Sequence, residues 1–147
     1  MNEEIIKRHN EVVGRDDIVI HCGDFCTKSN PFANSIIHRL NGTHEFLVGS
    51  HDSWLKNSIY NKNIIWEKKI DGIHLVACHY AMRTWPRSHH GSIQIHGHSH
   101  GNLSMAINQL DVGVDNTNFY PLSLKQIINI IKSHKLYETD RIRQRDI

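Results

Sequence analysis

The chain has 147 residues, a length that fits one domain with one hydrophobic core. Its 17 lysines and arginines nearly balance its 15 aspartates and glutamates, and a formal charge of +2 is too small to favour non-specific nucleic-acid binding. No run approaches the roughly 18 apolar residues that span a bilayer, and three cysteines without a secretory signal indicate a cytoplasmic location with free thiols.

The first half of the chain predicts helices that alternate with buried strands. Apolar residues at helical spacing predict a helix over residues 2–13. Residues 17–22 are a short, nearly continuous apolar run, typical of a strand that is buried on both faces. Residues 31–40 predict a second helix, and residues 45–48 predict a second buried strand. Each strand runs into a glycine and a cluster of polar residues.

The second half predicts a run of strands and a closing helix. Residues 64–70 and 73–78 are two strand candidates joined at Asp71-Gly72, a favoured hairpin turn. Three further segments predict two more strands and a final amphipathic helix, at residues 92–96, 110–114 and 122–131. Ser123 is the candidate cap of that helix. The order of elements favours an α/β fold in which sheets pack inside helical layers.

The C-terminal residues 140–147 contain three arginines and show no apolar periodicity before Ile147. This composition predicts a tail that is either a frayed end or a partner-binding extension. We therefore expect a single domain over residues 1–139 and a tail over residues 140–147.

Polar side chains follow four of the predicted strands. They are Asp24, then Ser50, His51 and Asp52, then His79, and finally His98 with His100. Functional sites in α/β sheets are built at the ends of strands. A carboxylate with several imidazoles suits Zn, Mn, Fe or Ni, and one carboxylate can bridge two ions through its two oxygens. The pattern predicts a site for one or two divalent transition metal ions.

Histidines are concentrated around these positions: seven of the chain's 13 lie between residues 74 and 100. Residues two apart on an extended segment point to the same side, so His98 and His100 can bind one metal or two neighbouring metals. An isolated histidine pair more often lies on a solvated strand or in an anion-binding patch. Here the polar clusters at the ends of the other strands favour a metal site. Cys22 and Cys26 are an alternative ligand pair, but their spacing differs from that of zinc ribbons.

The four polar blocks carry a family resemblance. Gly23-Asp24, Gly49-Ser50-His51-Asp52, His79 and Gly97-His98-Ser99-His100 follow one another as the motifs of calcineurin-like metallophosphoesterases do, particularly those of small phage and bacterial members. The resemblance covers nearly the whole chain and extends to residues 111–116. It implies a four-layer αββα fold, in which helices flank a β-sandwich core, with the N-terminal strand and its Asp-x-His block missing.

The resemblance also implies roles for individual residues. Asp24 would bridge two ions, His79 and His98 would bind one of them, and His100 would bind the other. A metal-activated hydroxide would attack phosphorus. His51 would stand near the leaving oxygen as a proton donor or charge stabiliser, with Asp52 orienting its ring.

Two departures from the family bear on this site. Both ligands of the Asp-x-His block are absent, so the ion of His100 would keep only His100 and Asp24. Ser50 stands where the family has an asparagine ligand, and a serine hydroxyl is a poorer donor. A mononuclear site with Asp24, His79 and His98 would resemble a three-ligand catalytic zinc site. The missing strand would leave unpaired ladder groups, which a homodimer or a swapped strand would cover.

The remaining polar residues leave alternatives open. Arg83, His89 and His90 lie in a predicted loop and would either contact a substrate phosphate or remain on the surface. Tyr80 and Trp85 would either stack on a nucleobase or pack in the core. His96 directly precedes the turn at Gly97 that leads to His98, and we expect His96 to be buried. These residues are typical of a loop beside a substrate site as well as of an ordinary surface loop.

The function expected from the sequence is metal-dependent hydrolysis of a nucleotide or another phosphodiester. One alternative is a degenerate, non-catalytic member that binds metal or nucleotide. Another is a structural metal site in an interaction protein, which the histidine-rich segment alone would explain but which leaves the Gly-Asp and His-Asp blocks unexplained.

Overall fold

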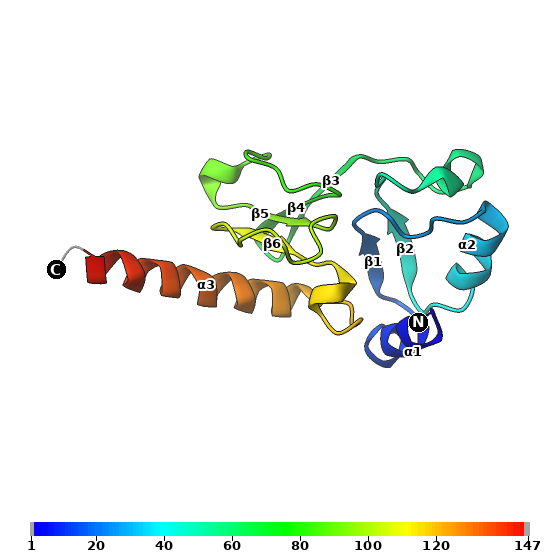
Figure 1. Ribbon diagram of the computed structural model, residues 1–147, viewed down its shortest axis with the longest axis horizontal. Helices are drawn as coiled ribbons and strands as arrows, with labels where there is room; N and C mark the ends of the chain where they lie inside the picture. Colours follow the sequence, from blue (N-terminus) through cyan, green and yellow to red (C-terminus); the bar gives the residue numbers. More distant parts are fainter. Residues whose placement is uncertain (1, 146–147) are drawn as a thin grey trace.

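The computed structural model describes the backbone of residues 2–145 and the side chains of residues 2–136 and 138. It is a mixed α/β protein with three α-helices and two β-sheets in this part of the chain (Figure 1). The expectation of an α/β fold is confirmed at this level. No helix in the described residues is long and apolar enough to cross a membrane.

The first sheet has two parallel strands. Helix α1 (Asn2–Val12) precedes β1 (Ile18–His21), and α2 (Asn30–Ile37) connects it to β2 (Thr43–Phe46). The strands pair in register from Ile18 opposite Thr43 to His21 opposite Phe46. Pro31 in the first turn of α2 has the fixed φ that a helix start requires.

Helix α2 covers an apolar cluster of this sheet. Its core consists of Cys26, Ala33, Ile37, Phe46, Trp54 and Leu55. Trp54 and Leu55 come from the short helix η1 (Ser53–Asn57), which follows the loop after β2. This packing holds the loops that follow β1 and β2 against the same core.

The second sheet has four strands in the order β3 (Ile65–Ile70), β4 (Ile73–Cys78), β5 (Ile93–His96) and β6 (Gln109–Asp111). Strands β3 and β4 are antiparallel, whereas β4, β5 and β6 are parallel to one another. The predicted hairpin at Asp71-Gly72 is confirmed, because both residues have the positive φ of a type I′ turn. Two short helices, η2 (Ser88–His90) and η3 (Val114–Asn116), lie in the connecting loops.

Helix α3 (Leu124–Arg145) runs along the four-stranded sheet (Figure 1). The core that it shares with the sheets is Leu47, Leu75, Ala77, Ile93, Ile95, Ile127 and Ile131. Its start is a capping box: the Gln126 N–H donates to Ser123 Oγ at 3.3 Å, and the Ser123 N–H donates to Gln126 Oε1 at 2.8 Å. Ser123 is therefore the cap that the sequence predicted.

Three predicted boundaries are corrected by the structure. Helix α3 does not end at Ile131, because no glycine or proline interrupts the helix-favouring residues that follow, and its backbone continues through residues 140–145 of the predicted tail. Residues 146–147 and the side chains of the tail lie outside the described residues. Strand β2 begins two residues earlier than predicted, and Leu47 leaves it to form an isolated parallel bridge with Asn63. Strand β6 ends at Asp111, and η3 follows.

Strand β1 is less buried than its apolar composition predicted. Within the described residues it pairs only with β2, so its other edge lacks a neighbouring strand. Ile18 at its start is 55% exposed. The prediction of a strand buried on both faces is therefore wrong at its N-terminal end.

Candidate metal centre

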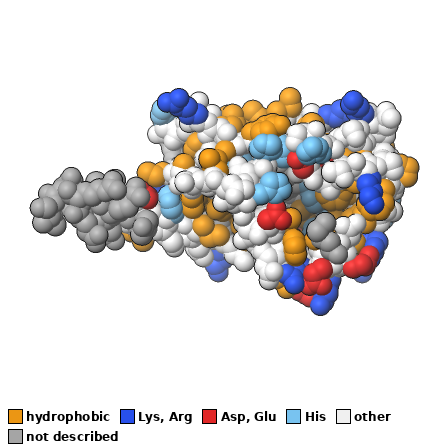
Figure 2. All heavy atoms as spheres, viewed as in Figure 1, with side chains coloured by type: hydrophobic (Ala, Val, Ile, Leu, Met, Phe, Trp, Pro, Cys, Tyr) orange, Lys and Arg blue, Asp and Glu red, His pale blue; other side chains and the backbone are white. Residues whose placement is uncertain are grey.

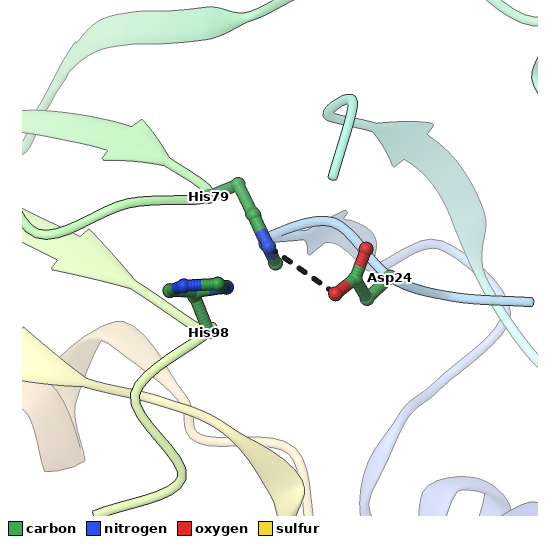
Figure 3. A group of neighbouring side chains, drawn as sticks. All are labelled: Asp24, His79 and His98. Atoms are coloured by element: carbon green, nitrogen blue, oxygen red, sulfur yellow. Dashed lines mark ion pairs between the residues drawn. The ribbon is translucent and has the colours of Figure 1, made fainter. Parts of the chain in front are cut away.

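Three of the predicted ligands converge at the carboxyl ends of three strands. Asp24 follows β1, His79 directly follows β4, and His98 follows β5. Each offers one ligand atom, and these atoms lie within 4.8 Å of one another. Figure 3 shows His79 pointing toward the Asp24 carboxylate, with the His98 ring beside that of His79. The three residues form the candidate metal centre.

The centre opens onto one face of the molecule. Figure 2 shows histidine side chains gathered with acidic ones near the middle of this face, whereas lysine and arginine side chains lie toward its edges. Asp24 is partly buried, His79 is buried and His98 is exposed. A ligand can therefore approach the centre from the side of His98.

His79 is the most constrained member of the group. Its side chain is 1% exposed, and Nδ1 donates a hydrogen bond to the Cys22 carbonyl oxygen at 2.9 Å. A carbonyl oxygen can only accept, so the proton of the neutral ring is on Nδ1 and Nε2 carries a lone pair. This Nε2 is buried, has no hydrogen-bond partner among the described residues, and lies 3.3 Å from Asp24 Oδ2.

The contact between His79 and Asp24 therefore brings a ring lone pair toward a carboxylate oxygen. Such a contact is unfavourable unless a proton or a cation lies between the two atoms. The carbonyl on the far side of the ring fixes its tautomer and orientation in the way that outer hydrogen bonds orient metal-binding histidines. The residues present fit a divalent transition metal ion.

Asp24 is held in its charged form. Burial alone would raise the pKa of its carboxyl group, but the His51 N–H, the positive charge that His79 carries when protonated and the Ser50 hydroxyl together lower it. The His51 N–H donates to Oδ1 at 2.7 Å, and Ser50 Oγ donates to Oδ2 at 3.1 Å. Asp24 is thus a carboxylate ligand that does not need to lose a proton before it binds a cation.

Two glycines allow the loops to approach this closely. Gly23 has φ +90°, and a Cβ there would lie 2.5 Å from His79 Nδ1. A Cβ at Gly49 would overlap the backbone nitrogen and carboxylate of Asp24. The Gly-Asp block therefore contains glycine because its loop packs directly against His79 and Gly49, and the Gly-Ser-His-Asp block contains glycine because its loop packs directly against Asp24.

Ser50 and His100 occupy different positions relative to the centre. Ser50 lies beside Asp24, where a weak ligand was predicted. His100 is exposed, is not one of the three converging ligands, and its Nδ1 lies 2.5 Å from Asp115 Oδ2. The hydrogen bond and charge of Asp115 raise the pKa of His100. The described residues thus bring together the ligands of one ion and leave His100 beside them.

The role expected for Asp52 needs correction. Its carboxylate accepts hydrogen bonds from the backbone N–H groups of Asp24, Cys26 and Gly49 and from Trp54 Nε1, at 2.5, 3.3, 2.9 and 2.8 Å. Both oxygens of the Asp52 carboxylate accept hydrogen bonds from these donors, and none of the donors is the His51 ring. Asp52 therefore ties the loop after β1 to the loop after β2 and positions Asp24.

The predicted substrate residues lie on the surface. Arg83, His89 and His90 are exposed in the segment between β4 and β5, with His89 and His90 in η2. None of them belongs to the group of three ligands. His51 is also exposed, although its backbone contacts Asp24. Their predicted contacts with a substrate stay predictions.

The cysteines are free, and none is a member of the ligand group. Burial, with smaller effects from Cys78 and Asp111, raises the pKa of Cys22 to about 12. The thiol of Cys22 is therefore protonated, and this residue contributes its carbonyl oxygen to His79. The expectation of free thiols is confirmed.

Sequence reasoning did not single out the residues that support the ligands. These are the Cys22 carbonyl, which orients His79, and Gln94 and Gln109, which bond to the segment that follows His79. Gln94 and Gln109 had a visible signal, since each is a polar residue within or beside a short apolar strand. The Cys22 carbonyl had none, because a backbone acceptor is independent of residue type.

Comparisons with known proteins bear on the fold. No protein-family model matches the chain. It is similar to uncharacterized protein MJ1445 of Methanocaldococcus jannaschii, with 28% identity over 148 residues that cover 95% of this chain and 80% of that protein. It is also similar to the crystal structure of AQ665, a protein of unknown function from Aquifex aeolicus, with a TM-score of 0.70 and 20% identity over 88% of this chain and 84% of that one. This structural likeness shows a shared fold alone.

Proposed function

We propose that this protein is a metal-dependent phosphoesterase of the calcineurin-like type that hydrolyses a phosphodiester, such as a nucleotide. The observation that carries the proposal is the buried Nε2 of His79, which has a lone pair, no hydrogen-bond partner within the described part of the chain, and the Asp24 carboxylate 3.3 Å away. His98 supplies a third ligand atom from the open side. Three ligands with an accessible fourth position are the arrangement of catalytic rather than structural metal sites.

The chain's own residues have separate tasks in this proposal. Asp24, His79 and His98 would hold a Mn, Fe, Ni or Zn ion, and when bound the ion would acidify a water and draw charge from the phosphoryl oxygens. His51, exposed beside Asp24, would donate a proton to the leaving oxygen or stabilise its charge. Arg83, His89 and His90 would contact the substrate from the loop between β4 and β5.

The finer parts of the fold belong to the same proposal. The order α2, two-stranded sheet, four-stranded sheet and α3 supports the four-layer αββα arrangement of that family. The open edge of β1 supports the idea of a strand missing beside it. A cytoplasmic location accords with the free cysteines.

Hydrolysis assays on metal-loaded protein test the proposal. Protein reconstituted with Mn, Ni or Zn should hydrolyse an aryl phosphodiester, and Asp24→Asn should lower the rate by roughly 100-fold because it removes a charged ligand. The substitution Asp71→Asn, at the exposed β3–β4 turn, is the matched control and should leave the rate unchanged. If the wild-type protein is no faster than Asp24→Asn on aryl diesters and monoesters, the catalytic proposal is wrong.

A second candidate is a non-catalytic member that binds metal without turnover. It is favoured by two features: Ser50 stands where the resembled family has an amide ligand, and His100 is paired with Asp115 outside the group of three. The two candidate functions are distinguished by the number of metal ions bound per chain. Two equivalents per chain would contradict the non-catalytic reading, whereas one equivalent without hydrolysis would support it.

A further inference from the structure

Two buried glutamines hold the segment that follows His79. Gln94 Nε2 donates to the Tyr80 carbonyl at 2.9 Å, and the Met82 N–H donates to Gln94 Oε1 at 3.2 Å. Gln109 Nε2 donates to the Met82 carbonyl at 2.7 Å and to Gln94 Oε1 at 2.5 Å. The backbone of residues 80–82 is therefore tied to both β5 and β6.

These hydrogen bonds have a role beyond the packing of the hydrophobic core. Gln94 is fully buried and Gln109 nearly so. A buried amide destabilises a fold unless its groups are paired, and an apolar side chain of similar volume would fill the same space without that requirement. Because the glutamines bond to the Tyr80 carbonyl and to both backbone groups of Met82, they fix the conformation of this one segment.

The segment of residues 80–82 places the Tyr80 ring beside the candidate metal centre. The ring makes edge-to-face contacts with His79 and with His98, each with a centroid distance of 4.7 Å. The two histidine rings are 4.9 Å apart, so the three rings contact one another. Tyr80 is 47% exposed, which makes it a poor contributor to the hydrophobic core.

His98 is the ligand that most needs such a contact. It lies in the loop after β5 with φ +63°, and its side chain is exposed. His79, by contrast, is buried and oriented by the Cys22 carbonyl. The ring contacts of His98 in the described residues are with His79 and Tyr80. Without Tyr80, the His98 ring would keep only its contact with His79 among these ring contacts of the described residues.

We propose that Tyr80 is a positioning residue for the metal ligand His98, and that Gln94 and Gln109 are its support. This proposal rests on the metal site of the proposed function. Tyr80 limits the rotamers of His98, so the ligand loses less conformational freedom when it binds an ion. The ring itself, rather than the phenolic hydroxyl, performs this task.

Equilibrium binding of Co²⁺, followed by its visible absorption, tests the proposal without any activity assay. Tyr80→Phe keeps the ring and should bind Co²⁺ as the wild type does. Tyr80→Ala should bind about threefold to tenfold more weakly, the range that corresponds to the loss of one aromatic pair, and should change the absorption bands that report ligand geometry. Gln94→Leu should weaken binding in the same way, with circular dichroism as the check that it folds.

Tyr120→Ala is the matched control, because this tyrosine bonds to Glu11 on α1 and is remote in sequence from the ligands. It should leave Co²⁺ binding unchanged. Equal affinity and identical spectra for Tyr80→Ala and the wild type would overturn the positioning role while the metal site stands. A wild-type protein that binds no Co²⁺ would overturn both the inference and the proposed function.

Discussion

At the scale of residues, the contact between His79 and Asp24 decides how the centre is interpreted. The lone pair of His79 Nε2 faces a carboxylate oxygen, and both groups are held in place by hydrogen bonds on their far sides. A metal-free protein of this geometry retains an unfavourable contact whenever the His79 ring is neutral. The site therefore sacrifices some stability for ligand geometry, as functional sites commonly do.

Asp24→Asn should accordingly stabilise the metal-free protein. An asparagine amide can donate to His79 Nε2 while its oxygen still accepts from the His51 N–H, which should raise the free energy of unfolding in EDTA by about 1 kcal/mol. Urea denaturation measures this value, and Asp71→Asn is the control. The same variant should lose the stabilisation that added Zn gives the wild type. A less stable Asp24→Asn in EDTA would mean that His79 and Asp24 form a favourable ion pair instead.

Asp52 should behave as a structural residue. Its carboxylate accepts from four donors in two loops, so Asp52→Asn would leave buried N–H groups without an acceptor. We expect the free energy of unfolding to fall by about 2 kcal/mol, whereas His51→Asn, at an exposed neighbouring position, should change it little. Urea denaturation of the two variants compares them. An Asp52→Asn protein of native stability would restore the expected role of orienting His51.

The sequence was most informative where chemistry depends on single residues. Asp24, His79 and His98 were identifiable because each follows an apolar strand, and the structure brings these three together. The role of Asp52 was not identifiable, because its partners are mainly backbone N–H groups. A backbone donor leaves no trace in residue type, so only the folded chain reveals it.

At the scale of elements, β1 and β2 carry two half-buried histidines, His21 and His44, that lie near the buried His9 of α1. His21 Nε2 and His44 Nδ1 are 3.0 Å apart, and His9 Nε2 is 2.9 Å from the Asn41 carbonyl. Burial, then the proximity of His44 and His9, lowers the pKa of His21 well below 6.5, and burial and His9 lower that of His44. The fold therefore favours the neutral rings of His21 and His44.

The histidine group should make the fold acid-sensitive. A lowered folded-state pKa means that the unfolded chain binds more protons, so stability is full above about pH 6.5 and falls as the pH drops below it. As the pH falls below 6.5, we expect the slope to approach about 1.4 kcal/mol per pH unit for a histidine that stays neutral in the folded protein. Urea denaturation at several pH values measures the slope.

His21→Phe should reduce that slope. The ring of His21 stacks on Phe46 and meets the edge of Phe25, so phenylalanine fits the same surroundings without a titrating group. The variant also loses the contact between His21 and His44 Nδ1. This loss should lower the free energy of unfolding without changing how that free energy depends on pH. An unchanged slope between pH 6.5 and 5 would show that other groups bind the protons.

Element types were easier to predict than their ends. The β3–β4 hairpin was visible because Asp-Gly favours the turn conformation that the structure has. The length of α3 was not visible, because apolar periodicity fades after Ile131 while the residues beyond it still favour a helix. Strand β2 was misplaced by two residues, since its first residues, Thr43 and His44, are polar although they pair with β1.

At the scale of the whole molecule, the main feature that lacks a partner among the described residues is the edge of β1 that pairs with no other strand. Ile18 at this edge and Val12 at the end of α1 are more than half exposed, and a cavity of about 510 Å³ is lined by Val12, β6 residues and the start of α3. An exposed apolar strand edge favours pairing with another chain. We expect a homodimer that covers this edge.

Light scattering after size exclusion tests the dimer. The wild-type protein should have twice the mass of one chain at tens of micromolar, and Ile18→Lys should be monomeric because a charged side chain on an edge strand opposes pairing. Ile59→Lys is the matched control, since Ile59 is exposed in a loop away from β1. A wild-type monomer at these concentrations would contradict the expectation.

The overall class was predictable from the order of helices and strands, and the pairing of the two sheets was not. The core that joins them contains Leu47, which follows β2, and Ile127 and Ile131 of α3. Such contacts depend on which faces meet, and apolar composition alone does not specify them. The support of Tyr80 by Gln94 and Gln109 arises from the same long-range packing.

An anomalous diffraction map of crystals soaked in Zn²⁺ tests the metal centre most directly. We predict a peak about 2.0–2.2 Å from a carboxylate oxygen of Asp24, from Nε2 of His79 and from a ring nitrogen of His98, with the Nδ1 of His79 still bonded to the Cys22 carbonyl. A map with no peak among these three residues, at a Zn²⁺ concentration that saturates binding elsewhere on the protein, would contradict the metal centre.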